Sequence, residues 1–163
     1  MKWLLFLTVT LFLATPCYGK DGAVPCPKLP SVKDLTWEYQ QGPDFHVCYA
    51  KQGDKDLFGV YFGNFPSFHP QQHNSIEQSF VGSQKVNWFP MTRDNKEIIG
   101  RQALMAEEKT ILFLGKNKRY LSYAHVMIST KLATEIKYVI SLLEGLKFGK
   151  LGHFVDASNF KKK

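Results

Sequence analysis

The clearest pattern of apolar and polar positions lies near the C-terminal end of the chain, in residues 131–148. Apolar residues recur there every three or four positions, which is the spacing of one face of an α-helix. The expected apolar stripe consists of Leu132, Ile136, Val139, Leu143 and Leu146, with Ala133 and Ile140 at its edge. The pattern predicts an amphipathic helix that Ser129 or Thr130 caps and that Gly149 ends.

Shorter segments that alternate between apolar and polar residues come before this helix. Residues 45–51 alternate throughout, and Phe58, Val60 and Phe62 share one face of the next such segment. Short turns join most of these segments, which predicts antiparallel pairing. The expected strands are 35–39, 45–51, 57–63, 86–91, 97–106, 110–114 and 120–128, with regular structure resuming at Phe80 before a tight turn at 82–83.

Two features of this pattern need interpretation. Residues 97–106 fit a helical period as well as a strand period, and we interpret them as a strand because a turn on each side leaves a segment of hairpin size. The next residues, Glu107, Glu108 and Lys109, are expected to form an exposed turn. Gly59 and Gly63 lie opposite the apolar face of their strand and would let another group approach the backbone closely.

A run of strands followed by one amphipathic helix indicates an α+β fold. An antiparallel sheet must cover at least one of its faces, and the apolar stripe of the helix is suited to that role. We therefore expect a curved antiparallel sheet of about seven strands with one C-terminal amphipathic helix packed across it.

One long segment, residues 64–79, follows neither period. Its sequence, NFPSFHPQQHNSIEQS, combines prolines, phenylalanines and histidines without a repeat. Loops of this length are uncommon in compact domains and often carry function.

The first residues of the chain have the pattern of a secretory signal peptide. Lys2 precedes an apolar run at residues 3–14, and we expect cleavage after the small residue Gly19. The run is too short for a transmembrane anchor, which needs about 20 apolar residues. Lipid attachment at Cys17 is disfavoured because Pro16 stands where a lipid-attachment motif has a small residue.

Export and composition together predict one folded domain. We expect a signal peptide at residues 1–19, a single globular α+β domain at 20–150 and a basic tail at 151–163, in a secreted or periplasmic protein. Cys26 and Cys48 are then the cysteines of the mature chain, and in an oxidising compartment they are expected to form a disulfide. In the chain-entropy model such a bond contributes about 3 kcal/mol.

The charge balance bears on the partner. The formal net charge is +7, and apart from Lys161–Lys163 the basic residues are spread along the chain. Such a charge most often only keeps a protein soluble, and we favour this interpretation. If the charge does serve binding, an exported basic protein meets anionic glycans, wall polymers, membrane surfaces and other exported proteins, and each of these is a candidate partner. We expect no nucleic-acid partner, because the sequence contains no recognition motif for one and the compartment holds little of it.

Motifs that carry catalysis or bind cofactors are missing from the sequence. There is no GxSxG nucleophile elbow and no glycine-rich phosphate loop, so we expect no cofactor. His69 and His73 have the spacing of a metal-binding pair, but Pro70 between them prevents the helix that gives this spacing its meaning. The sequence does not exclude a catalytic set assembled from distant residues, for instance around Ser122 and His125.

The remaining candidate is a surface of aromatic and basic residues around the long loop. Aromatic rings beside an arginine can stack on sugar rings, on other aromatic groups or on proline-rich peptides. The alternative is that the aromatic residues of the loop only close one end of the core. The candidate binding residues are Phe65, Phe68, His69, His73, Trp88 and Arg101.

We therefore expect an exported, non-catalytic binding or accessory domain. One alternative is an extracytoplasmic hydrolase whose site carries no sequence motif. Another is a basic protein held electrostatically at an anionic membrane or cell-wall surface, where each lysine near the surface contributes about 1 kcal/mol.

Overall fold

The computed structural model describes residues 26–93, 96–113, 115–130, 132–149 and 152–159, and every structural statement below refers to this part of the chain. The expected signal peptide, Cys17 and the lysine run 161–163 lie outside the described residues.

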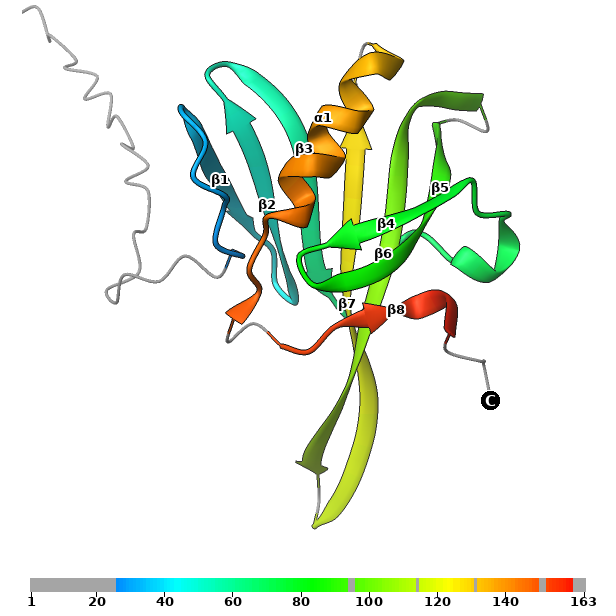
Figure 1. Cartoon of the computed structure of the whole chain (residues 1–163). Helices are drawn as coiled ribbons and strands as arrows, with labels where there is room; N and C mark the ends of the chain where they lie inside the picture. The colour runs from blue at the N-terminus through cyan, green and yellow to red at the C-terminus, as the bar shows by residue number, and fades with distance from the viewer. Residues whose placement is uncertain (1–25, 94–95, 114, 131, 150–151, 160–163) are drawn as a thin grey trace, which may run out of the picture.

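The protein has an α+β fold, with one curved, open antiparallel sheet and a single α-helix packed against it (Figure 1). The strand order is β1-β2-β3-β7-β6-β5-β4, and the short β8 pairs with β6. The strands are β1 (Leu35–Gln41), β2 (Phe45–Gln52), β3 (Lys55–Gly63), β4 (Glu77–Val81), β5 (Gln84–Arg93), β6 (Lys96–Phe113), β7 (Lys116–Ser129) and β8 (Val155–Asp156). The helices are α1 (Ala133–Glu144) and the 3₁₀ turns η1 (Pro70–Gln72) and η3 (Ala157–Asn159). The expected fold class is confirmed.

The two faces of the sheet carry separate hydrophobic clusters, because successive side chains of a strand point to opposite faces. The inner face, which α1 covers, holds the main core, with Val60, Trp88, Met105 and Val126 among its fully buried members. The outer face holds a smaller cluster of Phe68, Phe89, Leu104, Ala106 and Ala157. Residues 64–76, between β3 and β4, supply Phe68 to that outer cluster.

Helix α1 is shorter than the apolar pattern predicts. It spans Ala133–Glu144 instead of 131–148, and its buried residues are Ile136, Val139, Ile140, Leu142 and Leu143. Leu146 is buried after the helix has ended, whereas Leu132 precedes the helix and is 57% exposed. The predicted buried face of the helix is therefore correct in the middle of α1 and wrong at its N-terminal end.

Both predicted caps of the helix are wrong. Leu132 occupies the N-cap position with no side-chain cap, and the hydroxyl of Thr130 donates to the Leu132 carbonyl at 2.8 Å instead of to a helix amide. Gly145 is the C-cap residue and keeps right-handed backbone angles, so Gly149 does not end the helix.

The turn of the β4–β5 hairpin is bonded to the C-terminal end of α1. The amide of Gly82 donates to the carbonyl of Leu143 at 2.8 Å, and this carbonyl also accepts a hydrogen bond from the amide of Leu146 at 3.1 Å at the end of the helix. Gly82 has a φ of +59°, and a Cβ there would lie 2.7 Å from the carbonyl oxygen of Leu146. Only glycine fits this contact, which holds the edge of the curved sheet against the helix.

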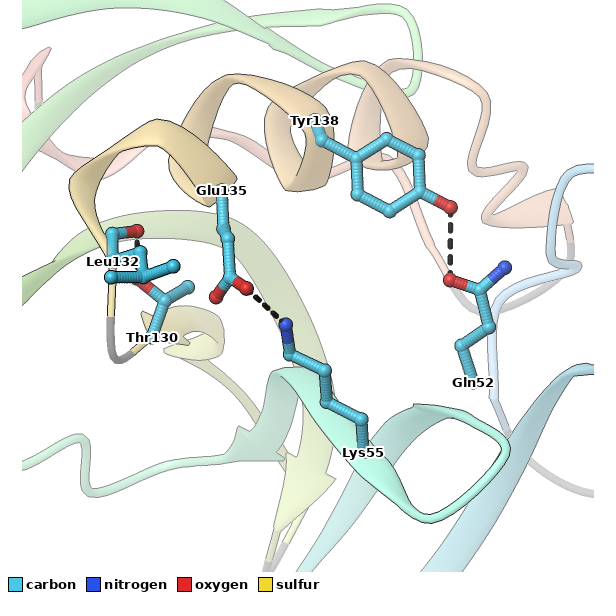
Figure 2. Close-up of polar contacts among 6 residues, drawn as sticks. All are labelled: Gln52, Lys55, Thr130, Leu132, Glu135 and Tyr138. Carbon is cyan, nitrogen blue, oxygen red and sulfur yellow. Dashed lines mark hydrogen bonds and ion pairs between the residues drawn. The ribbon is translucent and has the colours of Figure 1, made fainter.

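Polar contacts attach the other side of the helix to the β2–β3 turn. Figure 2 shows the ammonium group of Lys55 paired with the carboxylate of Glu135, and the hydroxyl of Tyr138 donating to Oε1 of Gln52 at 3.0 Å. Exposed pairs of this kind contribute little stability, and they fix the position of the helix over the sheet more than they strengthen it.

Three predicted boundaries differ from the structure. The expected turn at Glu107–Lys109 is wrong, because these residues lie within β6, which continues without a break from 96 to 113. The long loop is shorter than 64–79, since η1 interrupts it and β4 begins at Glu77. Residues 155–159 lie within the expected basic tail, and there β8 pairs with Met105 and Ala106 of β6 before η3.

The disulfide between Cys26 and Cys48 is confirmed, with the two Cα atoms 5.9 Å apart. It joins the segment before β1 to the inner face of β2. The indole Nε1 of Trp37 donates to the Pro27 carbonyl at 2.7 Å and holds the same segment in place.

Removal of the disulfide should destabilise the fold. Replacing Cys26 and Cys48 together with alanine should lower the free energy of unfolding by about 3 kcal/mol, because the unfolded chain regains the freedom of the closed loop. Urea unfolding followed by circular dichroism measures this. A reducing agent should destabilise the natural chain by a similar amount and leave the double variant unchanged; equal stability with and without reductant would contradict the prediction.

Truncation of Leu143 should show that α1 is the main cover of the sheet. The side chain is fully buried in the inner core, so Leu143→Ala should lower the free energy of unfolding by about 2–5 kcal/mol. Lys137→Ala, on the exposed side of the same helix, is the matched control and should change it by less than about 0.5 kcal/mol. Equal effects of the two changes would refute this packing.

Candidate functional site

The six candidate residues from the sequence do not form one surface. Trp88 is fully buried on the inner face, where its indole Nε1 donates to Oγ of Ser79 at 2.7 Å. Phe68 is buried on the outer face, on the opposite side of the sheet. Arg101 is partly exposed, and its Nε lies 3.1 Å from Oε1 of Glu77. The sheet therefore separates the aromatic residues that the sequence hypothesis placed together.

Phe68 covers a buried histidine on the outer face. Its ring stacks on that of His125 with centroids 5.6 Å apart, and it also contacts the rings of Phe89 and His73 at 5.3 Å. His69 and His73 themselves are exposed. For Phe68, the structure fits the alternative in which a loop aromatic closes part of the core.

His125 lies in an almost water-free environment with one polar partner. It is 3% exposed, and its Nε2 lies 3.1 Å from Oε1 of Gln102, whose amide donates to the Pro90 carbonyl at 2.8 Å. Burial disfavours the charged imidazolium and lowers the pKa of His125 from 6.5 to about 4. Ser122 lies three residues away on β7 and so on the opposite face, which prevents a direct Ser122–His125 catalytic pair.

Phe65 belongs to a different group of aromatic residues. It is 77% exposed, and its carbonyl accepts a hydrogen bond from the hydroxyl of Tyr61 at 3.3 Å. The ring of Tyr61 stacks on that of Phe45 with centroids 5.5 Å apart and planes at 28°. We call Phe45, Tyr61 and Phe65 the aromatic patch; it lies at the end of β2 and β3 where the long loop begins.

Glycines make room for the rings of the aromatic patch. A Cβ on Gly63 would lie 2.3 Å from the Tyr61 hydroxyl and 3.0 Å from Cβ of Phe45, and a Cβ on Gly42 would lie 2.3 Å from the Phe45 ring. The close backbone approach expected at Gly63 is therefore present, and the approaching groups are these two rings.

A cavity of about 300 Å³ lies at the same end of β2 and β3, on the face of the sheet opposite the rings of Phe45 and Tyr61. Residues 41–46 of the β1–β2 turn and residues 62–64 form two of its walls, and Lys109, Ser122 and Phe154 complete them. It combines aromatic rings with carboxylate, amide, hydroxyl and ammonium groups. We call it the base cavity because Lys109 and Ser122 lie at the base of the projecting hairpin described next.

Strands β6 and β7 continue beyond the sheet as a two-stranded ribbon, formed by residues 107–113 and 116–122, which projects away from the rest of the molecule (Figure 1). Among the described strands, β3 and β8 pair with them only as far as Tyr123 and Ala106. We call this ribbon the extension. Between residues 109 and 119 the sequence has no acidic residue and four basic ones: Lys109, Lys116, Lys118 and Arg119.

Ion pairs at the base of the extension involve its two glutamates. Oε1 of Glu107 accepts the amide of His153 at 3.0 Å, and its Oε2 lies 3.5 Å from the ammonium of Lys109. Arg119 is paired with Glu108 at 3.3 Å, yet its side chain is 77% exposed. Glu107 therefore fastens the extension to the chain after α1, while the positive charge further out faces solvent.

A second cavity, of about 550 Å³, lies between the β4–β5 turn and residues 144–149 and 152–154. Four of its lining residues are glycines, and Leu146, Phe148 and Phe154 supply most of its apolar side chains. It carries fewer side chains that could select a ligand than the base cavity does. Within the described residues, no group of three or more His, Cys, Asp or Glu side chains could hold a metal ion.

Comparisons with protein-family models, with curated proteins and with solved structures each find no match. None of the described helices is long and apolar enough to cross a membrane.

The sequence contained a signal for the aromatic patch that the site hypothesis did not use. Phe45 alternates onto the face opposite Cys48, and Gly63 lies across from it in the register of β2 and β3. An exposed aromatic residue opposite a glycine is a local sign of a ring lying on bare backbone. The extension gave no such sign, because its polar residues 107–109 have the composition of a turn.

Burial of His125 predicts a pH-dependent stability. Its pKa of about 4 in the folded protein lies below the unfolded value of 6.5, so the unfolded chain takes up the proton first as the pH falls. The contribution of His125 to the free energy of unfolding is fully present above about pH 6.5. About 2 kcal/mol of this contribution is lost by about pH 5. Urea unfolding at the two pH values measures the loss. His125→Gln should remove it and exposed His73→Gln should retain it; the same pH dependence in both variants would contradict the assignment.

Proposed function

We propose that the protein is an exported, non-catalytic binding domain whose partner is negatively charged, and that the extension is its main binding element. The single observation that carries the proposal is the projecting ribbon with four basic residues and no acidic residue between positions 109 and 119. Its export rests on the signal-peptide pattern of residues 1–19.

Electrostatics makes such an element effective at binding. A projecting ribbon brings its charges to a large partner before the rest of the surface, and like charges on one element add their fields. The ion pair of Arg119 with Glu108 is solvent-exposed and therefore weak, so it leaves the arginine able to contact a partner. The interaction must weaken as salt increases, because the charges lie in solvent.

A catalytic alternative has less support among the described residues. The hydrolase hypothesis needs a nucleophile, a base and a third group within hydrogen-bond reach of one another. The candidate pair Ser122 and His125 lies on opposite faces of β7, and the burial of His125 keeps it away from solvent. We therefore keep the non-catalytic proposal.

Neutralising the end of the extension should weaken binding to polyanions. The triple variant K116Q/K118Q/R119Q should bind dextran sulfate about a hundredfold more weakly, since each of the three charges near an anionic surface contributes about 1 kcal/mol. It should also show a smaller dependence of affinity on salt. Titration calorimetry over a series of salt concentrations measures both.

The matched control is K33Q/K85Q/K137Q, which removes the same charge from exposed positions on other elements. It should bind nearly as well as the natural chain. If both triple variants lose the same affinity, net charge alone is responsible and the extension is not the binding element.

A further inference from the structure

We infer that the outer edge of β7 in the extension binds an extended acidic segment of a partner protein, which adds to the sheet as one more strand. This inference rests on the proposed function, because the same basic ribbon is the binding element. It adds the chemical class of the partner and the way in which it binds, which the charge of the extension alone does not give.

One side of β7 has no neighbouring strand along the extension. Among the described strands, β3 pairs with β7 only as far as Gly63 opposite Tyr123. The chain then turns to the outer face of the sheet, where Phe68 packs. Within the described part of the chain, the place beside residues 116–122 that a longer β3 would fill therefore holds no strand (Figure 1).

The pairing of β7 with β6 shows which backbone groups point to this edge. The amide of Thr130 donates to the carbonyl of Ile99 at 3.2 Å, so these residues, one step beyond the paired strands, form a hydrogen-bonded pair. Hydrogen-bonded pairs alternate along an antiparallel ladder, and this register is unbroken as far as the turn. Even-numbered residues of β7 therefore bond to β6. The odd-numbered residues of the extension, Asn117, Arg119 and Leu121, direct their N–H and C=O groups to the outer edge.

The charges along this edge discriminate between the strands that could add to it. An exposed edge is a template for another strand, and proteins protect such edges with charged side chains, lysine above all. Pairing of this edge with the same edge of a second copy would bring Lys116, Lys118 and Arg119 against like charges, which is unfavourable. An acidic strand would meet opposite charges instead. The edge therefore disfavours self-association and is selective for an acidic segment.

The alternation of side chains specifies the pattern of that segment. Lys116 and Lys118 have the same parity in β7 as Val126, so they lie on the side of the ribbon that continues the inner face. Residues of an added strand across from these two lysines would be two positions apart. The best partner therefore has acidic residues at every second position, and the residues between them supply the N–H groups that bond to β7.

The backbone groups of the edge favour a polypeptide over other polyanions. A polysaccharide or a lipid surface can meet the charges of the lysines, but neither carries the regular row of N–H and C=O groups that completes a β-ladder. Strand addition also leaves the β6–β7 pair unchanged, because it uses only groups that point away from β6. The coexistence of an unpaired ladder edge with a row of basic side chains is the observation that selects an acidic protein segment.

Proline at an edge position tests the inference without a change of charge. Leu121→Pro removes one N–H from the outer edge and none of the hydrogen bonds to β6, and edge strands tolerate proline in this orientation. In titration calorimetry of the full mature chain, Leu121→Pro should bind a peptide of alternating glutamate and threonine about tenfold more weakly. Leu121→Ala keeps the N–H and should bind the peptide about as tightly as the natural chain. Both variants should bind dextran sulfate, which has no amide ladder, with unchanged affinity.

Modified peptides extend the test to the natural chain, so that it does not depend on how a variant folds. N-methylation of the threonines removes the N–H groups that face β7 when the glutamates lie across from the lysines, and it should weaken binding about tenfold. N-methylation of the glutamates instead affects groups that point away from β7 and should leave binding nearly unchanged. Circular dichroism spectra establish that the two Leu121 variants are folded.

The outcomes separate the inference from the proposed function. If Leu121→Pro binds the peptide as tightly as Leu121→Ala does, and the two methylated peptides bind equally well, strand addition is refuted while the role of the charges stands. If sedimentation shows that the natural chain dimerises and that Leu121→Pro does not, the edge pairs with a second copy and the inference is overturned. If K116Q/K118Q/R119Q binds peptide and dextran sulfate unchanged, the proposed function fails, and the selection of an acidic segment fails with it even where Leu121→Pro weakens peptide binding.

Discussion

The pairing of β6 with β7 is the interaction on which the rest of the structure depends. Its register runs unbroken from Gly100 opposite Ser129 to Phe113 opposite Lys116. Because side chains alternate along a strand, this one register sends Met105 to the inner core and His125 to the outer face. A slip of β7 by one residue would turn its side chains to the opposite face relative to β6, and Lys116 and Lys118 would then no longer share a side with Lys109.

The two faces of the sheet are covered in different ways. Helix α1 and the β4–β5 turn cover the inner face, where the larger core lies. On the outer face, Phe68 from the long loop packs over β5, β6 and β7. The end of β2 and β3 holds Phe45 and Tyr61 with partial exposure instead. Phe45 is 37% exposed and Leu143 is fully buried, so Phe45 can be changed with less risk to the fold than Leu143.

Strand faces could be predicted from the sequence, whereas the candidate site could not. Alternation places Phe58, Val60 and Phe62 inside, as the structure has them, because burial on one face imposes a period of two. The loop that carries Phe65 and Phe68 has no period, so nothing in its sequence shows that one side chain is exposed and the other buried. The length of β6 could not be predicted for a related reason. Polar residues on a ribbon that reaches into solvent have the composition of a turn, and only their pairing with β7 shows that they form a strand.

The extension has an energetic property that links its structure to the proposed binding. A two-stranded ribbon outside a sheet is only marginally stable in water, and like charges along it repel one another. Here the ribbon persists because it continues an established ladder, and because Glu107 fastens its base to the amide of His153. A bound polyanion would contact the basic side chains along the ribbon and so add to the interactions that hold it in place. Because the ribbon has no other part of the sheet beside it, such contacts would add a larger share to its stability than they would to that of the inner strands.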